Sequence, residues 1–158
     1  MSENLTAREA NEMVRDPLDI QRILAPTDFS AASEEALAHA LAIAKRFNAK
    51  ISLLYVCQAQ FYANEFAYLP KEESRKSLES FARSRIAPEL LGEMLVRNGE
   101  AADEIAKAAE ELDADLVVIN THGNTGLKHV MLGSTAERVV RYAPCPVLVV
   151  REVVRRHA

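Results

Sequence analysis

The chain alternates short apolar runs with longer stretches of helical periodicity, and this alternation limits the possible folds more than any other feature. The runs "LLYV" (53–56), "LVVI" (116–119) and "VLVV" (147–150) are uniformly apolar and rich in β-branched residues. Such strands are typical of a sheet that is covered on both faces. Strands that alternate with helices form βαβ units, whose right-handed crossovers give a parallel sheet. We therefore expect one doubly wound, Rossmann-like α/β domain with helices on both faces.

The expected elements follow from apolar periodicity and from the residues that begin or end helices. Five strands are predicted at 20–25, 49–57, 93–98, 115–120 and 145–152. Helices are predicted after the N-cap Ser30, within 70–86, from Ala101 to Leu112, and at 136–143, where Ser134 and Glu137 would form a capping box. Residues 58–69 are predicted to be a polar and aromatic connection. The folded domain is expected to span 20–152, with a flexible arm at 1–19 and a tail at 153–158.

Composition excludes several classes of function. The formal net charge is −4, whereas dedicated binders of nucleic acid or of anionic membranes present a basic surface. No apolar run approaches the roughly 20 residues that span a bilayer. The N-terminal stretch is polar, unlike a secretory signal. We expect a cytoplasmic protein that binds neither nucleic acid nor membrane, in which Cys57 and Cys145 are buried and reduced.

A glycine-rich segment between the fourth strand and the last helix is the first candidate site. The chain has five glycines, and Gly123, Gly126 and Gly133 all fall in "NTHGNTGLKHVMLGST" (120–135). Gly123 and Gly133 would allow positive φ and let backbone N–H groups approach a ligand. The following helix N-terminus, with Ser134 and Thr135, would favour phosphate oxygens. On spacing alone, the segment could equally be a set of turns, and it matches neither a P-loop nor the dinucleotide fingerprint.

Asp28 is the second candidate, because it follows the first predicted strand. In open α/β sheets, ligands bind beyond the carboxyl ends of the strands, where the strand order reverses. A carboxylate at this point could bind a ribose diol or a metal ion. It could equally satisfy the first N–H groups of the next helix. The residues themselves leave both interpretations open.

The two candidate segments together resemble the universal stress protein family. The motifs "PTDFS" (26–30) and "THG-x9-GSTAERVVRYAPCPVLVV" carry the resemblance, which covers roughly residues 18–152. The resemblance implies the strand order 3-2-1-4-5, a homodimer, and an ATP-binding branch with a Gly-x2-Gly-x9-Gly-Ser/Thr signature. Gly123, Gly133 and Ser134 match that signature. Asn120 stands in place of its first glycine, although asparagine tolerates a left-handed backbone well.

The resemblance also implies a role for each residue of the site. Asp28 would hold the ribose of ATP, and Mg²⁺ or Mn²⁺ would be held mainly by phosphate oxygens and water rather than by protein side chains. Pro26, Thr27 and Val56 would line the adenine pocket. Gly123, Gly133, Ser134 and Thr135 would bind the phosphates, with Asn120 beside the ribose or the α-phosphate.

Two functions remain open after these steps. The first is an ATP-binding, dimeric regulatory or signalling module of a stress response. It would have at most slow ATP hydrolysis and no catalytic residue, because no general base or nucleophile is placed for phosphoryl transfer. The alternative is a dimeric scaffold or chaperone-like module of the same family that binds no nucleotide. In both, the C-terminal strand "VLVVREVV" (147–154) is expected to form the dimer edge.

Overall fold

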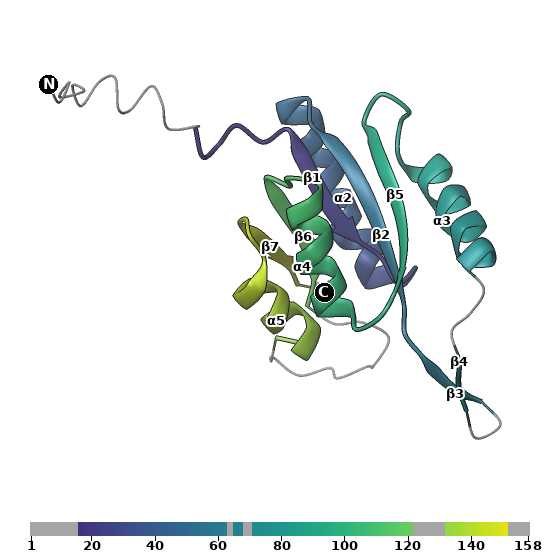
Figure 1. Ribbon diagram of the computed structural model, residues 1–158. Coiled ribbons are helices and arrows are strands. Elements are labelled where there is room, and N and C mark those ends of the chain that lie inside the picture. Colours follow the sequence, from purple (N-terminus) through teal and green to yellow (C-terminus); the bar gives the residue numbers. More distant parts are fainter. Residues whose placement is uncertain (1–15, 63–64, 68–70, 122–131, 152–158) are drawn as a thin grey trace, which may run out of the picture.

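A five-stranded parallel sheet forms the centre of the computed structural model, which describes residues 16–62, 65–67, 71–121 and 132–151 (Figure 1). Its order is β5-β2-β1-β6-β7, which confirms the predicted order 3-2-1-4-5. The strands are β1 Arg22–Pro26, β2 Lys50–Cys57, β5 Leu91–Asn98, β6 Leu116–Asn120 and β7 Val147–Val150. All four strand pairings in this sheet are parallel. The chain termini predicted as arm and tail lie largely outside the described residues.

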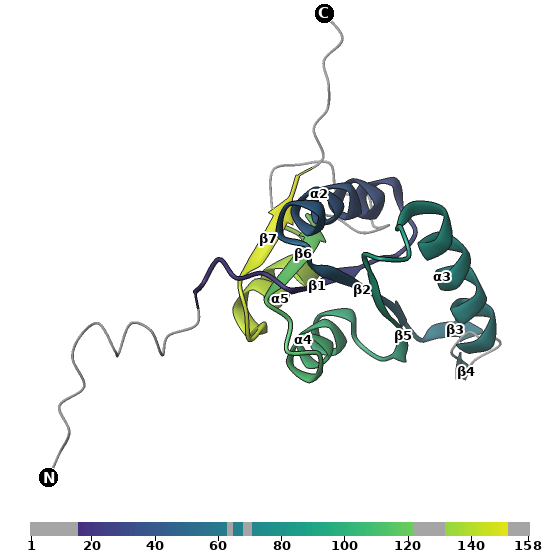
Figure 2. The same ribbon diagram turned by 90° about the horizontal axis from the view of Figure 1, so that it is seen from above.

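Among the described residues, four helices cover the sheet, two on each face (Figure 2). Helices α2 (Ala31–Phe47) and α3 (Lys71–Arg85) lie on one face, and α4 (Ala101–Glu111) and α5 (Ser134–Tyr142) lie on the other. Neighbouring strand residues therefore enter different cores. Ile23 packs in the cluster with α2 and α3, whereas Leu24 packs in the cluster with α4 and α5. This arrangement explains why the strands are apolar at every position rather than at alternate ones.

Helix α2 begins where the sequence predicts. Ser30 has extended backbone, and its side-chain oxygen accepts a hydrogen bond from the Ser33 N–H at 3.2 Å. The helix ends at Phe47, and its C-cap Asn48 has a φ of 55°, a left-handed conformation that asparagine tolerates. Lys45 and Arg46 in the last turn complement the negative end of the helix dipole. The predicted N-cap is confirmed.

Polar contacts fix the beginning of β1. Oδ2 of Asp115 accepts hydrogen bonds from the N–H groups of Gln21 (2.9 Å) and Arg22 (2.8 Å). The Arg22 guanidinium also lies 3.7 Å from the other oxygen of this carboxylate. One carboxylate at the start of β6 thus holds the start of its neighbour in the sheet.

Several predicted boundaries were wrong. The first strand begins at Arg22 and includes Pro26, and the third strand begins at Leu91. The last strand begins only at Val147, because Pro146 has no N–H group to pair with β6. Within the predicted connection 58–69, β3 (Gln60–Tyr62) and β4 (Glu65–Ala67) pair as an antiparallel hairpin. Aromatic residues favour extended backbone, so this stretch forms a strand pair rather than an irregular connection.

The β2–β5 pairing contains an irregularity that requires glycine. The register shifts between Ile51 and Leu53, opposite Gly92. A Cβ atom at position 92 would lie 2.7 Å from Ser52 Oγ and 3.2 Å from the Ile51 carbonyl oxygen. Both distances are shorter than ordinary van der Waals contact, so a side chain fits only if the Ser52 hydroxyl moves away from the Glu93 N–H that it accepts from and the Ile51 carbonyl shifts slightly.

We expect Gly92→Ala to lower the free energy of unfolding by about 1–3 kcal/mol, the usual cost of overpacking a filled site. Urea unfolding followed by circular dichroism measures this change. Gly92→Ala should cost less stability when it is introduced into Ser52→Ala than when it is introduced into the parent protein, because the nearest clashing atom is then gone. Equal stability of Gly92→Ala and the parent protein would contradict the close approach.

Candidate functional site

The switch point of the sheet lies between β1 and β6. From β1 the chain continues to β2 on one side, while β6 pairs with β1 on the other side. Asp28 follows the carboxyl end of β1, and Asn120 is the last residue of β6. The fold therefore brings together the ends of the two strands that carry the predicted site segments. This is the position at which open α/β sheets bind ligands.

The Asp28 carboxylate is held by the residue that caps α2. Its Oδ1 accepts a hydrogen bond from the Ser30 N–H at 3.0 Å and a second, short one from the Ser30 hydroxyl. In the described part of the chain, both hydrogen bonds to this carboxylate end on Oδ1. Asp28 itself is half-buried. The two interpretations left open by the sequence are thus compatible, because one oxygen serves the helix start while the other is not used there.

A buried pair of hydroxyls, from Thr27 and Ser33, supports the loop at residues 27–30 from the interior of the domain. Thr27 is 7% exposed and Ser33 is 1% exposed, and their oxygens are 3.1 Å apart. Thr27 Oγ1 accepts from the Phe29 N–H at 3.0 Å, and the Ser33 hydroxyl donates to the Ser30 carbonyl at 2.8 Å. The Thr27 N–H donates to the Leu54 carbonyl. Thr27, predicted to line an adenine pocket, uses its hydroxyl and its N–H inside the protein.

Phe29 fixes the loop from the other side of Asp28. Its φ of 63° is in the left-handed region, which is unusual for an aromatic residue and costs about 1–3 kcal/mol. The ring packs 4.8 Å from the Tyr55 ring and 5.4 Å from the Phe81 ring, measured between centroids. These contacts offset the backbone strain. Sequence reasoning treated Phe29 only as part of the "PTDFS" motif and missed its role as an anchor.

Tyr55 and Val56 point to opposite faces of the sheet at the end of β2. Tyr55 packs against the α2 and α3 cluster, while Val56 packs against the α4 and α5 cluster. Burial raises the pKa of the Tyr55 phenol, and electrostatic interactions with Cys57 and Asp28 raise it further. Tyr55 is therefore a neutral hydroxyl near Asp28. Pro26, also predicted for the adenine pocket, is half-buried as the last residue of β1.

The start of α5 differs from the prediction. The helix begins at Ser134, and its N-cap is Gly133, without a side-chain hydrogen bond. The expected Ser134–Glu137 capping box and the positive φ at Gly133 were both wrong, since Gly133 has φ −60° and ψ 151°. The Gly133 N–H donates to the Thr121 carbonyl at 2.9 Å, and this bond keeps Gly133 extended beside the end of β6. Ser134 is exposed, and Thr135 is half-buried in the first turn.

Some residues of the predicted glycine segment lie in the described part of the chain, and others do not. Asn120 and Gly133 lie at the two described ends of the glycine segment, joined by the Thr121–Gly133 hydrogen bond. Gly123 lies outside the described residues. The N-cap of α5 makes no side-chain hydrogen bond, and the first N–H groups of a helix are donors that suit an anion.

Arg138 connects the two helices on this face, and sequence reasoning missed it. Its guanidinium nitrogens lie 2.7 Å from Glu100 Oε2 and 2.7 Å from Asp103 Oδ1. Glu100 is also the N-cap of α4. Arg138 therefore joins the first turn of α4 to α5, and its charge is directed to these carboxylates. No local sequence pattern relates residues this far apart.

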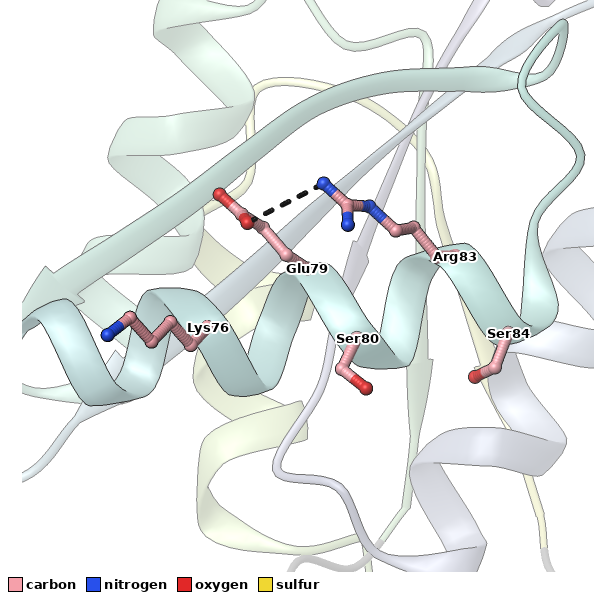
Figure 3. Close-up of a pocket in the computed structure, with 5 residues that line it drawn as sticks. All are labelled: Lys76, Glu79, Ser80, Arg83 and Ser84. Atoms are coloured by element: carbon pink, nitrogen blue, oxygen red, sulfur yellow. Dashed lines mark ion pairs between the residues drawn. The ribbon is translucent and has the colours of Figure 1, made fainter.

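Two open hollows on the described residues lie along α3 rather than at the switch point. One, of about 500 Å³, is lined by residues of α3 alone: Lys76, Glu79, Ser80, Arg83 and Ser84 (Figure 3). Glu79 and Arg83 form an ion pair at 3.9 Å, and the two serines point away from that pair. A second hollow, along the same helix, reaches Phe29. Both are shallow depressions beside a solvent-exposed helix, so we do not assign the site to them.

Metal binding and thiol chemistry find little support in the described residues. No group of three or more His, Cys, Asp or Glu side chains there could hold a metal ion. Cys57 is buried, with its sulfur 3.4 Å from Ser74 Oγ. Cys145 is only half-buried, which corrects the expectation of two buried thiols, and burial still raises its pKa.

In the part of the chain that the structure describes, no helix is long and apolar enough to cross a membrane.

Comparison with sequence families gives one match over most of the chain. The model of the universal stress protein family matches residues 19–151. Universal stress protein MJ0531 of Methanocaldococcus jannaschii is 37% identical over 153 residues, covering 90% of this chain and 89% of the relative. Universal stress protein YxiE of Bacillus subtilis is 32% identical over 145 residues, covering 82% of this chain and 98% of the relative.

Solved structures give the same family. The universal stress protein UspA from Lactobacillus plantarum superposes with a TM-score of 0.64 at 27% identity, covering 84% of this chain and 98% of the other. A universal stress protein whose crystal structure is a complex with cAMP superposes with a TM-score of 0.60 at 25% identity, covering 84% of this chain and 97% of the other.

Proposed function

The chain belongs to the universal stress protein family, and from this premise we propose that it is an ATP-binding, dimeric regulatory module. The nucleotide would lie at the carboxyl ends of β1 and β6. The observation that carries this proposal is that Asp28 follows the carboxyl end of β1, while the start of α5 is tied to the end of the adjacent strand β6 by the Gly133–Thr121 hydrogen bond. The complex of a structural relative with cAMP supports a nucleotide as the ligand class.

Each end of ATP finds suitable chemistry in this arrangement. The Asp28 carboxylate would accept hydrogen bonds from the ribose hydroxyls, and Pro26, Thr27 and Val56 would border the adenine. The first N–H groups of α5, with Ser134 and Thr135, would donate to phosphate oxygens. Gly133 and Gly123 would let backbone amides approach, beside Asn120. Mg²⁺ or Mn²⁺ would be held by phosphate oxygens and water.

Isothermal titration with ATP and Mg²⁺ tests the proposal, with cAMP titrated in parallel. We expect saturable binding of ATP, and native mass spectrometry of the freshly purified protein should report any nucleotide that is carried along. No heat with either ligand, together with no bound nucleotide, would reject nucleotide binding. Stronger binding of cAMP than of ATP would leave a nucleotide site but change its ligand.

We expect Asp28→Ala to weaken ATP binding by about 10-fold to 150-fold, because hydrogen bonds to a charged acceptor contribute about 1.5–3 kcal/mol. Titration of the variant with ATP measures the loss. Inorganic tripolyphosphate serves as the control ligand, since it has no ribose and should bind both proteins equally. An equal loss for both ligands would contradict the ribose role of Asp28.

The dimer is proposed to form through β7, which is an edge strand of the described sheet. Leu148 on this strand is 37% exposed, and Val140 and Tyr142 on the adjacent α5 are also exposed. Val149, in contrast, packs against the α4 and α5 cluster. A charge at Leu148 therefore tests the edge without entering the core.

We expect Leu148→Asp to convert the dimer into a monomer in light scattering, because a buried, unpaired carboxylate at the interface opposes association. Phe47→Asp, which places the same charge at an exposed apolar residue of α2, is the matched control and should leave the dimer intact. A Leu148→Asp protein that remains dimeric would exclude β7 as the interface.

The alternative function is a dimeric scaffold or chaperone-like module without nucleotide. One observation favours it: Asn120, at the end of β6, occupies the position of the first glycine of the ATP signature. Under this alternative the dimer forms but titration with ATP and cAMP gives no heat. The free thiols Cys57 and Cys145 support a reducing compartment such as the cytoplasm under either function.

A further inference from the structure

The hydrogen bonds of Asp28 are unequally divided between its two oxygens. Oδ1 accepts both from the Ser30 N–H and from the Ser30 hydroxyl, and in the described residues neither of these donors is shared with Oδ2. Two donors from one residue fix both the position and the rotation of the carboxylate. We infer that Ser30 is a positioning residue, which holds Oδ1 of Asp28 so that Oδ2 is the acceptor presented to the ribose hydroxyls. This inference rests on the proposed nucleotide site.

Ser30 is itself held in place by buried groups. Its hydroxyl accepts from the Ser33 N–H at 3.2 Å, and its carbonyl accepts from the Ser33 hydroxyl at 2.8 Å. Ser33 is almost completely buried and lies against the buried Thr27 hydroxyl. The support for Asp28 thus extends through Ser30 to the interior of the domain. A carboxylate held in this way loses less conformational freedom when it binds a ligand.

The Ser30 hydroxyl has two separable roles, and the separation makes the inference testable. It accepts from Ser33 as the N-cap of α2, and it donates to Asp28. Ser30→Thr retains both roles. Ser30→Asp retains the cap acceptor, since aspartate is among the best N-cap residues, but it cannot donate and it repels Asp28. Helix capping and carboxylate positioning are therefore changed independently.

The measurement is the ratio of the dissociation constants of 2′,3′-dideoxy-ATP and ATP, determined by titration at pH 8. This ratio reports the contribution of the ribose hydroxyls, and a general loss of stability does not change it. We expect Ser30→Thr to keep the parent ratio and Ser30→Asp to reduce it at least fivefold, with thermal unfolding of both variants close to the parent. In an Asp28→Ala background, Ser30→Asp should not change the ratio further, because Ser30 acts through Asp28.

A second measurement is made on the protein without nucleotide. Asp28→Ala should accelerate hydrogen exchange of the Ser30 amide at least tenfold, because its acceptor is removed. An unchanged exchange rate would overturn the inference, as would an unchanged ratio in Ser30→Asp when the parent protein discriminates between the two nucleotides. If the parent protein binds no nucleotide, the proposed function fails and the ribose role fails with it. The amide exchange then still reports whether Ser30 and Asp28 are linked.

Discussion

Leu24→Ala is expected to lower the free energy of unfolding by about 2.7–5 kcal/mol, the range for removing a large apolar side chain from a filled core. Leu24 is 0% exposed on β1, the central strand of the sheet. It packs in the cluster beneath α4 and α5. Neighbours on the strands on either side limit the collapse of the cavity, so we expect a value above the lower end.

Chemical denaturation with a two-state fit measures this change. Leu18→Ala is the matched control, because Leu18 is 65% exposed just before the same strand and should lose less than about 0.5 kcal/mol. A loss below about 1.5 kcal/mol for Leu24→Ala would show that the centre of this core is less tightly packed than the structure indicates.

Gly123→Val is expected to reduce the affinity for ATP more than a hundredfold without loss of the fold. Gly123 is the middle glycine of the family signature, with nine residues between it and Gly133. If backbone amides at this position approach the phosphates, a β-branched side chain would stand between them. Titration with ATP measures affinity, and thermal unfolding by circular dichroism verifies the fold.

Gly126→Val is the matched control for this variant. Gly126 belongs to the same glycine-rich segment but not to the signature spacing, so the same substitution there should change ATP affinity less than fivefold. Equal losses in the two variants would indicate a general distortion of the segment. Unchanged affinity in Gly123→Val would remove this residue from the phosphate site.

The architecture could be predicted from the sequence because it depends on the pattern of apolar residues along the chain. The uniform runs that form β2, β6 and β7 predict a sheet covered on both faces, and the sheet has this form. Strand ends were predicted less well, since they depend on individual backbone hydrogen bonds. Pro146 shortens β7 for this reason, and the β3–β4 hairpin arises from pairing between segments too short to show a periodic pattern.

For the candidate site, the sequence could predict where Asp28 and Ser30 lie in the fold but not which contacts they make. Asp28 and Ser30 follow from their positions after a strand and before a helix. The short bond between them, and the positive φ of Phe29, depend on tertiary packing and have no local signature. The cap was predicted at Ser134 but lies at Gly133, whose extended backbone is held by a hydrogen bond to the Thr121 carbonyl, a contact that no local pattern indicates.

The paired contacts at the two ends of β1 have a consequence for the accuracy of folding. A strand that is apolar on both faces would bury nearly as much apolar surface if it shifted along its neighbours. Hydrophobicity alone therefore specifies its register weakly. Asp115 accepts hydrogen bonds from the backbone at the start of β1, and the Thr27 hydroxyl bonds to the Ser33 hydroxyl just after its end. A shifted strand would break the contacts with Asp115 and leave the buried Thr27 and Ser33 hydroxyls without each other, and that loss favours the native alignment. Thr27 and Ser33, which orient the loop at Asp28, therefore also help to fix the register of the central strand.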